Sequence, residues 1–233
     1  MKRKKFELFM AVIIILFALF FSNMGVQLVS SQKVKEKKNQ TIVIDSGHGG
    51  MDGGKISVLG DYEKDINLSI AKKLQALLKK AGYKVIMTRE DDQGLYSETS
   101  ANKKAEDMKA RCSIIDTTGV TLAVSIHQNS YHQESVNGAQ VFYYESSDQG
   151  KKLAETIQTA LVDGLDKSNT RKAKSNTTYY LLRKTSTPIV IVECGFLSNY
   201  DEAKKLVSDT YQEKVAKAIF QGIETYLENE DEN

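Results

Sequence analysis

Three strongly apolar runs, each followed directly by polar residues, most constrain how this chain can fold. They occupy residues 41–45, 122–126 and 188–192. Aliphatic runs without polar alternation are typical of strands that are buried on both faces of a parallel sheet. Segments with helical spacing of apolar residues lie between them. The alternation of strands and helices predicts an α/β fold. We expect a single domain with a central, mostly parallel or mixed β-sheet covered by helices on both faces.

The remaining elements follow from periodicity and turn residues. Helices are expected over residues 65–81, 100–117, 149–165, 201–207 and 211–227, and further strands over 84–88 and 139–144. Residues 168–178 are basic and polar and are expected to form a connection, with short ordered structure at 179–182.

The first 31 residues are predicted to be an export segment, either a signal peptide or a signal-anchor. Four basic residues at 2–5 precede an apolar stretch from 8 to 21, and weaker apolar character continues to residue 29. Because no clean Ala-x-Ala cleavage site follows, we favour an uncleaved hydrophobic helix that anchors the chain in a membrane. Residues 32–40 then form a linker, 41–229 the folded domain and 230–233 an acidic tail. The positive-inside rule predicts that all of them are extracytoplasmic.

Charge and cysteine content exclude two classes of protein. The chain carries a net charge of +2, but residues 41–233 hold 24 basic and 28 acidic side chains. A nucleic-acid-binding domain needs a basic face on its folded part, so nucleic acid is not an expected partner. Two cysteines, Cys112 and Cys194, are too few for a disulfide framework and do not form a Cys-x-x-Cys metal motif.

Two of the three histidines and one glutamate stand where the apolar runs end. His48 follows the first run, His127 the second and Glu193 the third. In open α/β sheets, ligands gather at the carboxyl ends of strands. Zn²⁺ suits imidazole and carboxylate ligands, and a catalytic zinc site keeps one position open for water. The sequence therefore predicts a site for one zinc ion, with His48 and His127 as ligands.

The third ligand should be a carboxylate, and spacing alone leaves several open. Glu63 is the best local candidate, because it follows a glycine-rich loop and directly precedes a predicted helix that can return it toward the first strand. The competing carboxylates are Asp45, Asp52, Asp61 and Asp65.

Glu193 is then available as a general base. At the end of an apolar strand, partial burial would raise its pKa toward neutrality. Zinc makes water a nucleophile at neutral pH and polarises a carbonyl group, and this combination hydrolyses amide bonds.

Three other polar residues are candidates for a role. His132 lies in a polar loop and is expected to be solvated. Ser46 lacks the Gly-x-Ser-x-Gly surroundings of a nucleophile. Arg171 belongs to a basic loop that is either simply solvated or clamps a substrate carboxylate or carbonyl near the metal.

Five motifs together give the chain a strong family resemblance. They are Ile-Asp-Ser-Gly-His-Gly-Gly at 44–50, Tyr-Glu-Lys-Asp-Ile-Asn-Leu at 62–68, Thr-Arg at 88–89, Ser-Ile-His-Gln-Asn at 125–129 and Val-Glu-Cys-Gly-Phe-Leu-Ser-Asn at 192–199. In order and interval they resemble the zinc-dependent N-acetylmuramoyl-L-alanine amidases of the Amidase_3 type.

The resemblance implies roles for particular residues. It places zinc on His48, Glu63 and His127, makes Glu193 the catalytic glutamate and supports a substrate or catalytic role for Arg171. One departure is Ser46, where the family more often has proline. This change relaxes the loop and removes no ligand.

Within the family, the chain is similar to the germination-specific amidases of spore-forming bacteria. Segments 94–96, 138–144 and 169–174 carry this similarity. It implies that the substrate is peptidoglycan of the spore cortex, where removal of the stem peptide leads toward muramic-δ-lactam, and that the domain lies in the space between the forespore membranes. A spore lipoprotein is a candidate partner.

Three other functions remain open from the sequence. One is a vegetative cell-wall amidase or autolysin. The second is another zinc hydrolase, such as a carboxypeptidase or a polysaccharide deacetylase. The third is a peptidoglycan-binding or partner-binding protein with a degenerate metal site.

Overall fold

The computed structural model describes residues 10, 17 and 39–231. Apart from residues 10 and 17, the expected export segment lies outside the described residues, as does nearly all of the expected linker. Within the described part, no helix combines the length and the apolar character that crossing a bilayer requires.

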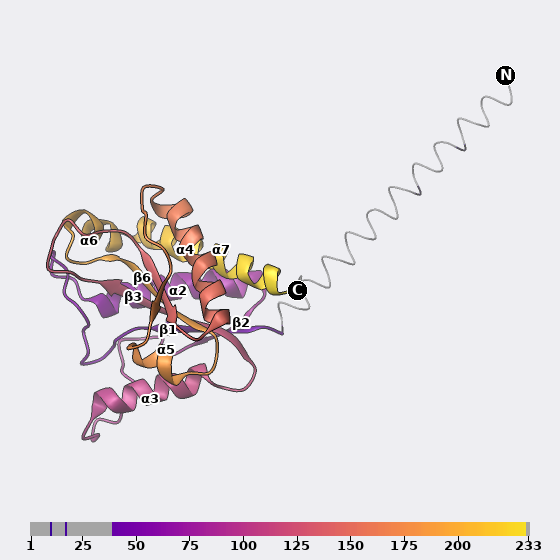
Figure 1. Cartoon of the computed structure of the whole chain (residues 1–233). Helices are drawn as coiled ribbons and strands as arrows, with labels where there is room; N and C mark the ends of the chain where they lie inside the picture. Colours follow the sequence, from indigo (N-terminus) through magenta and orange to yellow (C-terminus); the bar gives the residue numbers. More distant parts are fainter. Residues whose placement is uncertain (1–9, 11–16, 18–38, 232–233) are drawn as a thin grey trace. The chain divides into compact units, whose positions relative to one another are not determined.

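A six-stranded sheet forms the centre of the domain (Figure 1). Its strands are β1 (Thr41–Ser46), β2 (Lys84–Met87), β3 (Val120–Asn129), β4 (Gln140–Tyr144), β5 (Lys174–Asn176) and β6 (Ile189–Phe196). They lie in the order β2-β1-β3-β6-β4-β5. Strands β2, β1, β3 and β6 run parallel to one another, while β4 runs antiparallel to β6 and parallel to β5. The prediction of a mostly parallel, mixed sheet is confirmed.

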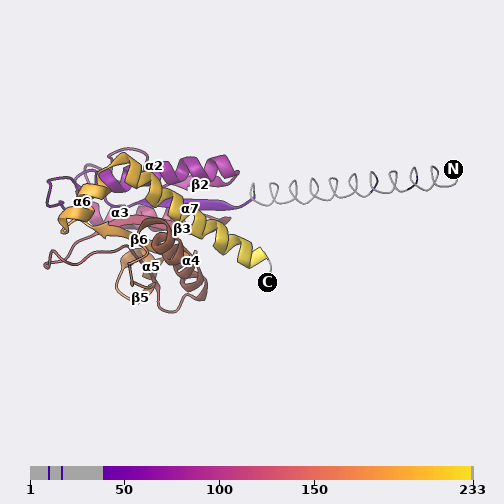
Figure 2. The same cartoon turned by 90° about the horizontal axis from the view of Figure 1, so that it is seen from above.

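Helices cover both faces of this sheet, as Figures 1 and 2 show. They are α2 (Glu63–Ala81), α3 (Lys103–Ile115), α4 (Asp148–Leu165), α5 (Tyr180–Lys184), α6 (Tyr200–Leu206) and α7 (Asp209–Asp231). Helices α2, α4 and α7 pack together on one face, and α3 and α5 cover the other. The predicted arrangement of layers is therefore confirmed for the described residues.

The apolar runs fill two cores at once because successive side chains of a strand point to opposite faces. In β1, Ile42 and Ile44 pack with the core under α2, α4 and α7, while Val43 between them packs with the core under α3 and α5. All three side chains are completely buried. This two-sided burial explains why three consecutive positions in the middle of the strand are all apolar.

Strand β5 and the end of helix α7 differ from the prediction. Strand β5 lies within the segment expected to be a connection, and it pairs with β4 through main-chain hydrogen bonds that require no apolar pattern. Helix α7 continues to Asp231, into the expected acidic tail. Its last turns are held by an ion pair of 2.8 Å between Lys152 Nζ and Glu230 Oε1 and by a hydrogen bond from Tyr226 to Gln149.

Candidate active site and metal centre

Four secondary-structure elements deliver the predicted site residues to one edge of the sheet. His48 lies in the loop after β1, His127 lies near the end of β3, and Glu193 lies on β6. Glu63 is the first residue of α2, where its charge also favours the helix dipole. The parallel direction of β1, β3 and β6 places their carboxyl ends at the same edge. The structure therefore brings the residues expected at the strand ends to a single edge of the sheet.

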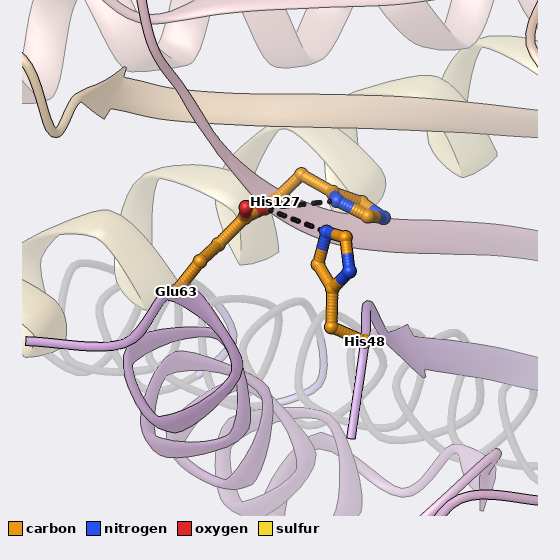
Figure 3. A group of neighbouring side chains, drawn as sticks. All are labelled: His48, Glu63 and His127. Atoms are coloured by element: carbon orange, nitrogen blue, oxygen red, sulfur yellow. Dashed lines mark hydrogen bonds and ion pairs between the residues drawn. The ribbon is translucent and has the colours of Figure 1, made fainter. Parts of the chain in front are cut away.

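Glu63 lies between the two histidines (Figure 3). Its Oε1 atom is 3.2 Å from His48 Nε2 and 3.1 Å from His127 Nδ1. The ligand atoms of these three residues all lie within 4.8 Å of one another. Two imidazole nitrogens and a carboxylate oxygen at this separation are the donor set of a catalytic zinc site, which leaves a fourth position open. The residues present therefore fit a zinc ion.

The Glu63 carboxylate is fixed in place by main-chain donors. Lys55 N donates to Oε2 over 2.9 Å, and Gln128 N donates to Oε1 over 3.0 Å. Burial alone would raise the pKa of this carboxyl, but the hydrogen bonds and charges of His127 and His48 lower it well below its usual range. Glu63 is therefore ionised and preorganised as a ligand.

His48 has a carboxylate on its other ring nitrogen. Its Nδ1 atom lies 3.0 Å from Asp52 Oδ1. Histidines that bind metal ions usually donate their second N–H to such a partner, which fixes the tautomer and the orientation of the ring. Asp52, one of the competing carboxylates, thus supports a ligand and leaves Nε2 for the metal.

Two glycines make room for the ligands. A Cβ atom on Gly47 would lie 2.3 Å from His127 Cε1 and Nε2, and one on Gly54 would lie 2.6 Å from Glu63 Oε2. Both distances are far below van der Waals contact, so a side chain at either position would displace a ligand. The glycine-rich loop therefore lies close against the candidate ligands.

Glu193 lies beside the three candidate ligands in a cavity of about 370 Å³, whose lining includes His48, His127 and Tyr179. Burial raises the pKa of Glu193 to about 7. The charge of His127 opposes this shift, and the nearby charge of Glu63 adds to it. Its Oε2 atom accepts no hydrogen bond from any residue that the structure describes. A buried carboxyl with a free oxygen and a pKa near neutrality suits a general base.

The other competing carboxylates have different roles. Asp45 is completely buried and pairs with Arg111 over 2.7 Å. Asp61 accepts a hydrogen bond from Ser57, and Asp65 is exposed in the first turn of α2. The choice of Glu63 is therefore supported by tertiary contacts that spacing could not reveal.

Arg171 lies outside the group that lines this cavity. Its Nε donates to Asn137 O over 2.7 Å, its Nη1 donates to Gln140 Oε1 over 3.2 Å, and its guanidinium stacks on Phe196 at 4.8 Å. Gln140 is the β4 neighbour of Glu193 on β6. Arg171 thus braces the strand beside the base, and its direct action on substrate stays a prediction.

The remaining polar candidates are consistent with their structural interpretation. His132 is exposed and stacks on Tyr131. Ser46 is buried, and its hydroxyl contacts no base among the described residues. Cys112 and Cys194 are both free thiols.

Sequence reasoning missed the role of two buried arginines, Arg89 and Arg111, which bind the backbone of the loop that carries His48. A signal for Arg111 was present. It lies three residues after Met108 and four before Ile115, on the face of its helix that was expected to be apolar. A charged residue in such a place needs a buried partner.

Residues 42–225 match the N-acetylmuramoyl-L-alanine amidase family Amidase_3. This chain belongs to that family. It is accordingly an N-acetylmuramoyl-L-alanine amidase, a hydrolase of peptidoglycan, and the resemblance seen in its motifs is confirmed.

Relatives within the family include a germination-specific amidase. The germination-specific N-acetylmuramoyl-L-alanine amidase of Bacillus subtilis is 40% identical over 190 residues, which cover 80% of this chain and 79% of that protein. The CwlD amidase of Clostridioides difficile, solved in complex with the GerS lipoprotein, is 44% identical with a TM-score of 0.78, covering 81% of this chain and 98% of that one. The amidase AmiC2 of Nostoc punctiforme is 34% identical with a TM-score of 0.71, covering 82% and 98%.

Proposed function

We propose that this amidase is zinc-dependent and acts on spore-cortex peptidoglycan, where it hydrolyses the amide bond between N-acetylmuramic acid and the L-alanine of the stem peptide. The observation that carries the zinc assignment is the position of Glu63 Oε1, within 3.2 Å of nitrogens from both His48 and His127. In a protein without a metal site, a buried carboxylate between two imidazoles would serve only as their ion-pair partner. In a family of amidases, these three side chains would bind zinc and leave its fourth coordination position open for the reacting water.

The chemistry divides between the metal and Glu193. Zinc held by His48, Glu63 and His127 would supply a Lewis acid that activates water and polarises the scissile carbonyl. Glu193 accepts a proton from the attacking water and then delivers it to the nitrogen of L-alanine as the C–N bond breaks. Its raised pKa of about 7 suits both transfers, because neither protonation state is strongly favoured near neutral pH.

The cortex assignment rests on relatives. The Bacillus subtilis protein is named for germination, and the Clostridioides difficile protein was solved with a lipoprotein. We propose by analogy that a spore lipoprotein is a partner of this amidase. The basic and apolar residues before position 31 support export and membrane attachment, which would place the domain between the forespore membranes.

A single experiment tests the enzymatic proposal. The full-length chain, purified in detergent, is incubated with cortex-type and with vegetative peptidoglycan, with stoichiometric zinc or with chelator, and products are identified by mass spectrometry. We expect zinc-dependent release of stem peptides with a free L-alanine amine, faster from cortex-type material. Equal activity in chelator would contradict the role of zinc.

Other outcomes separate the alternative functions. Preference for vegetative material would indicate a cell-wall autolysin. Cleavage within the stem peptide would indicate a carboxypeptidase, and loss of acetate a deacetylase. A chain that binds no zinc and releases nothing would indicate a binding protein with a degenerate site.

A further inference from the structure

Two buried guanidinium groups hold three consecutive carbonyls of the loop that carries His48. Ser46 O accepts hydrogen bonds from Arg89 Nε over 2.9 Å and from Arg111 Nη1 over 2.8 Å. Gly47 O accepts from Arg89 Nη2 over 3.1 Å, and His48 O accepts from Arg111 Nη2 over 2.6 Å. Charged donors make stronger hydrogen bonds than neutral ones. The main chain of this loop is therefore held in place, in addition to the contacts made by the imidazole ring of His48.

The backbone at His48 needs such support. Its φ angle is 62°, and it is the one residue other than glycine with a positive φ in the part of the chain that the structure describes. Residues with a Cβ atom disfavour this region, and they remain in it only where surrounding contacts over-determine the conformation. The Arg111 contact to the His48 carbonyl acts directly on the peptide unit that this angle orients.

Arg111 is in turn fixed by two carboxylates. Its side chain is 2% exposed, and its Nη1 and Nε atoms lie 2.7 Å from Asp45 Oδ1 and 2.6 Å from Asp107 Oδ2. Asp45 also accepts hydrogen bonds from Thr88 and Ser125. Burial opposes the charge on Arg111, but Asp45 and Asp107 raise its pKa above the usual range. The cation is therefore permanent and has a single orientation.

We infer that Arg111 is a positioning residue for the candidate metal centre. By holding the His48 carbonyl and being held by Asp45 and Asp107, it keeps the His48 ring where Nε2 meets Glu63, and it thereby sets the affinity for zinc. This inference rests on the proposed zinc dependence. It differs from a purely structural role, in which Arg111 would contribute to folding alone and leave the metal affinity of the folded protein unchanged.

Lysine at this position separates the two roles. Arg111→Lys keeps a positive charge for Asp45, but one ammonium group on a flexible stem cannot bind all four partner residues of the guanidinium at once. The matched control is Lys109→Met, which changes an exposed residue on the same helix. Both full-length variants are compared with the unchanged chain in zinc affinity, by competition with a chromophoric chelator, and in thermal unfolding. Cobalt(II) absorption spectra report the ligand geometry.

We expect Arg111→Lys to bind zinc about 10- to 100-fold more weakly while folded, the range found when partners of metal ligands are removed. Its cobalt spectrum should also change, and Lys109→Met should match the unchanged chain in both measurements. A folded Arg111→Lys protein with unchanged zinc affinity and an unchanged cobalt spectrum would overturn the inference.

A second variant keeps the test decisive if Arg111→Lys does not fold. Asp107→Asn alters a partly exposed partner and leaves the buried Arg111–Asp45 pair intact. We expect it to weaken zinc binding several-fold, and unchanged affinity would again overturn the inference. If the unchanged chain itself bound no zinc, the proposed function would fail. If the unchanged chain bound zinc tightly and the variants bound it equally tightly, the inference about Arg111 would fail while the proposed function would stand.

Discussion

His127 on β3 is the register partner of Glu193 on β6. Register partners on adjacent parallel strands point to the same face of a sheet, so the candidate ligand and the candidate base are presented side by side into one cavity. Rigid strands therefore fix the separation between the metal position and the base, and no loop movement is needed to bring them together.

Replacing the base should abolish most of the activity without removing the metal. Glu193→Gln keeps the size of the side chain but cannot accept a proton, so we expect kcat to fall about 10²- to 10⁴-fold. Stem-peptide release gives the rate, and metal analysis of the purified protein gives the zinc content. Activity within tenfold of the unchanged chain would exclude Glu193 as the general base.

The same substitution should change how stability depends on pH in the metal-free protein. Burial raises the pKa of Glu193 to about 7, so the folded state binds this proton more tightly than the unfolded state. The stabilising contribution is complete below the unfolded pKa of about 4.5 and is lost as the pH rises through about 7.

Glutamine stays neutral throughout, so the Glu193→Gln protein should gain stability over the unchanged chain as the pH rises. We expect a gain of up to about 3 kcal/mol near pH 8 and almost none near pH 4.5. Urea unfolding of both proteins in chelator measures this difference. A difference that did not vary with pH would refute the raised pKa.

A methyl group on Gly47 should disrupt the centre. The added Cβ would meet the His127 ring at 2.3 Å, so Gly47→Ala should displace the ring and weaken both zinc binding and activity by at least tenfold. Gly164→Ala is a matched control on α4, where the added atom meets only Ala218 Cβ at 3.3 Å. Isothermal titration with zinc compares the two, and equal affinities would argue against close packing around His127.

Arg171 should affect the rate without affecting the metal. Its hydrogen bonds go to Asn137 and Gln140, away from the three candidate ligands. We expect Arg171→Met to lower kcat/KM by about tenfold, because the strand beside Glu193 loses a brace, and to leave zinc affinity unchanged. Steady-state kinetics together with chelator competition measure both. A loss above a thousandfold would point instead to direct contact with the reacting groups.

The sequence predicted the layers of this fold because its central strands are buried on both faces. Ile42, Val43 and Ile44 have to be apolar together, and that pattern is visible without any structure. Strand β5 was not predictable in the same way, since Lys174, Ser175 and Asn176 contribute mainly main-chain hydrogen bonds to the sheet.

The sequence predicted those site residues that lie near the end of a predicted strand. His48, His127 and Glu193 each come after an apolar run. Glu63 is distinguished from the competing carboxylates only by contacts that form when the chain folds. Spacing could not show that Asp45 is neutralised by Arg111, which is 66 residues further along the chain. The family motifs supplied the choice that physical reasoning from spacing left open.

The direction of β1 determines which edge of the sheet the chain enters first. The chain enters the sheet at Thr41 and reaches the candidate site only after Ser46, at the opposite end of the strand. Six residues at about 3.3 Å each separate the two edges by about 20 Å. The preceding residues therefore join the domain at the edge of the sheet remote from His48, so that this junction does not occupy the edge that carries the candidate site.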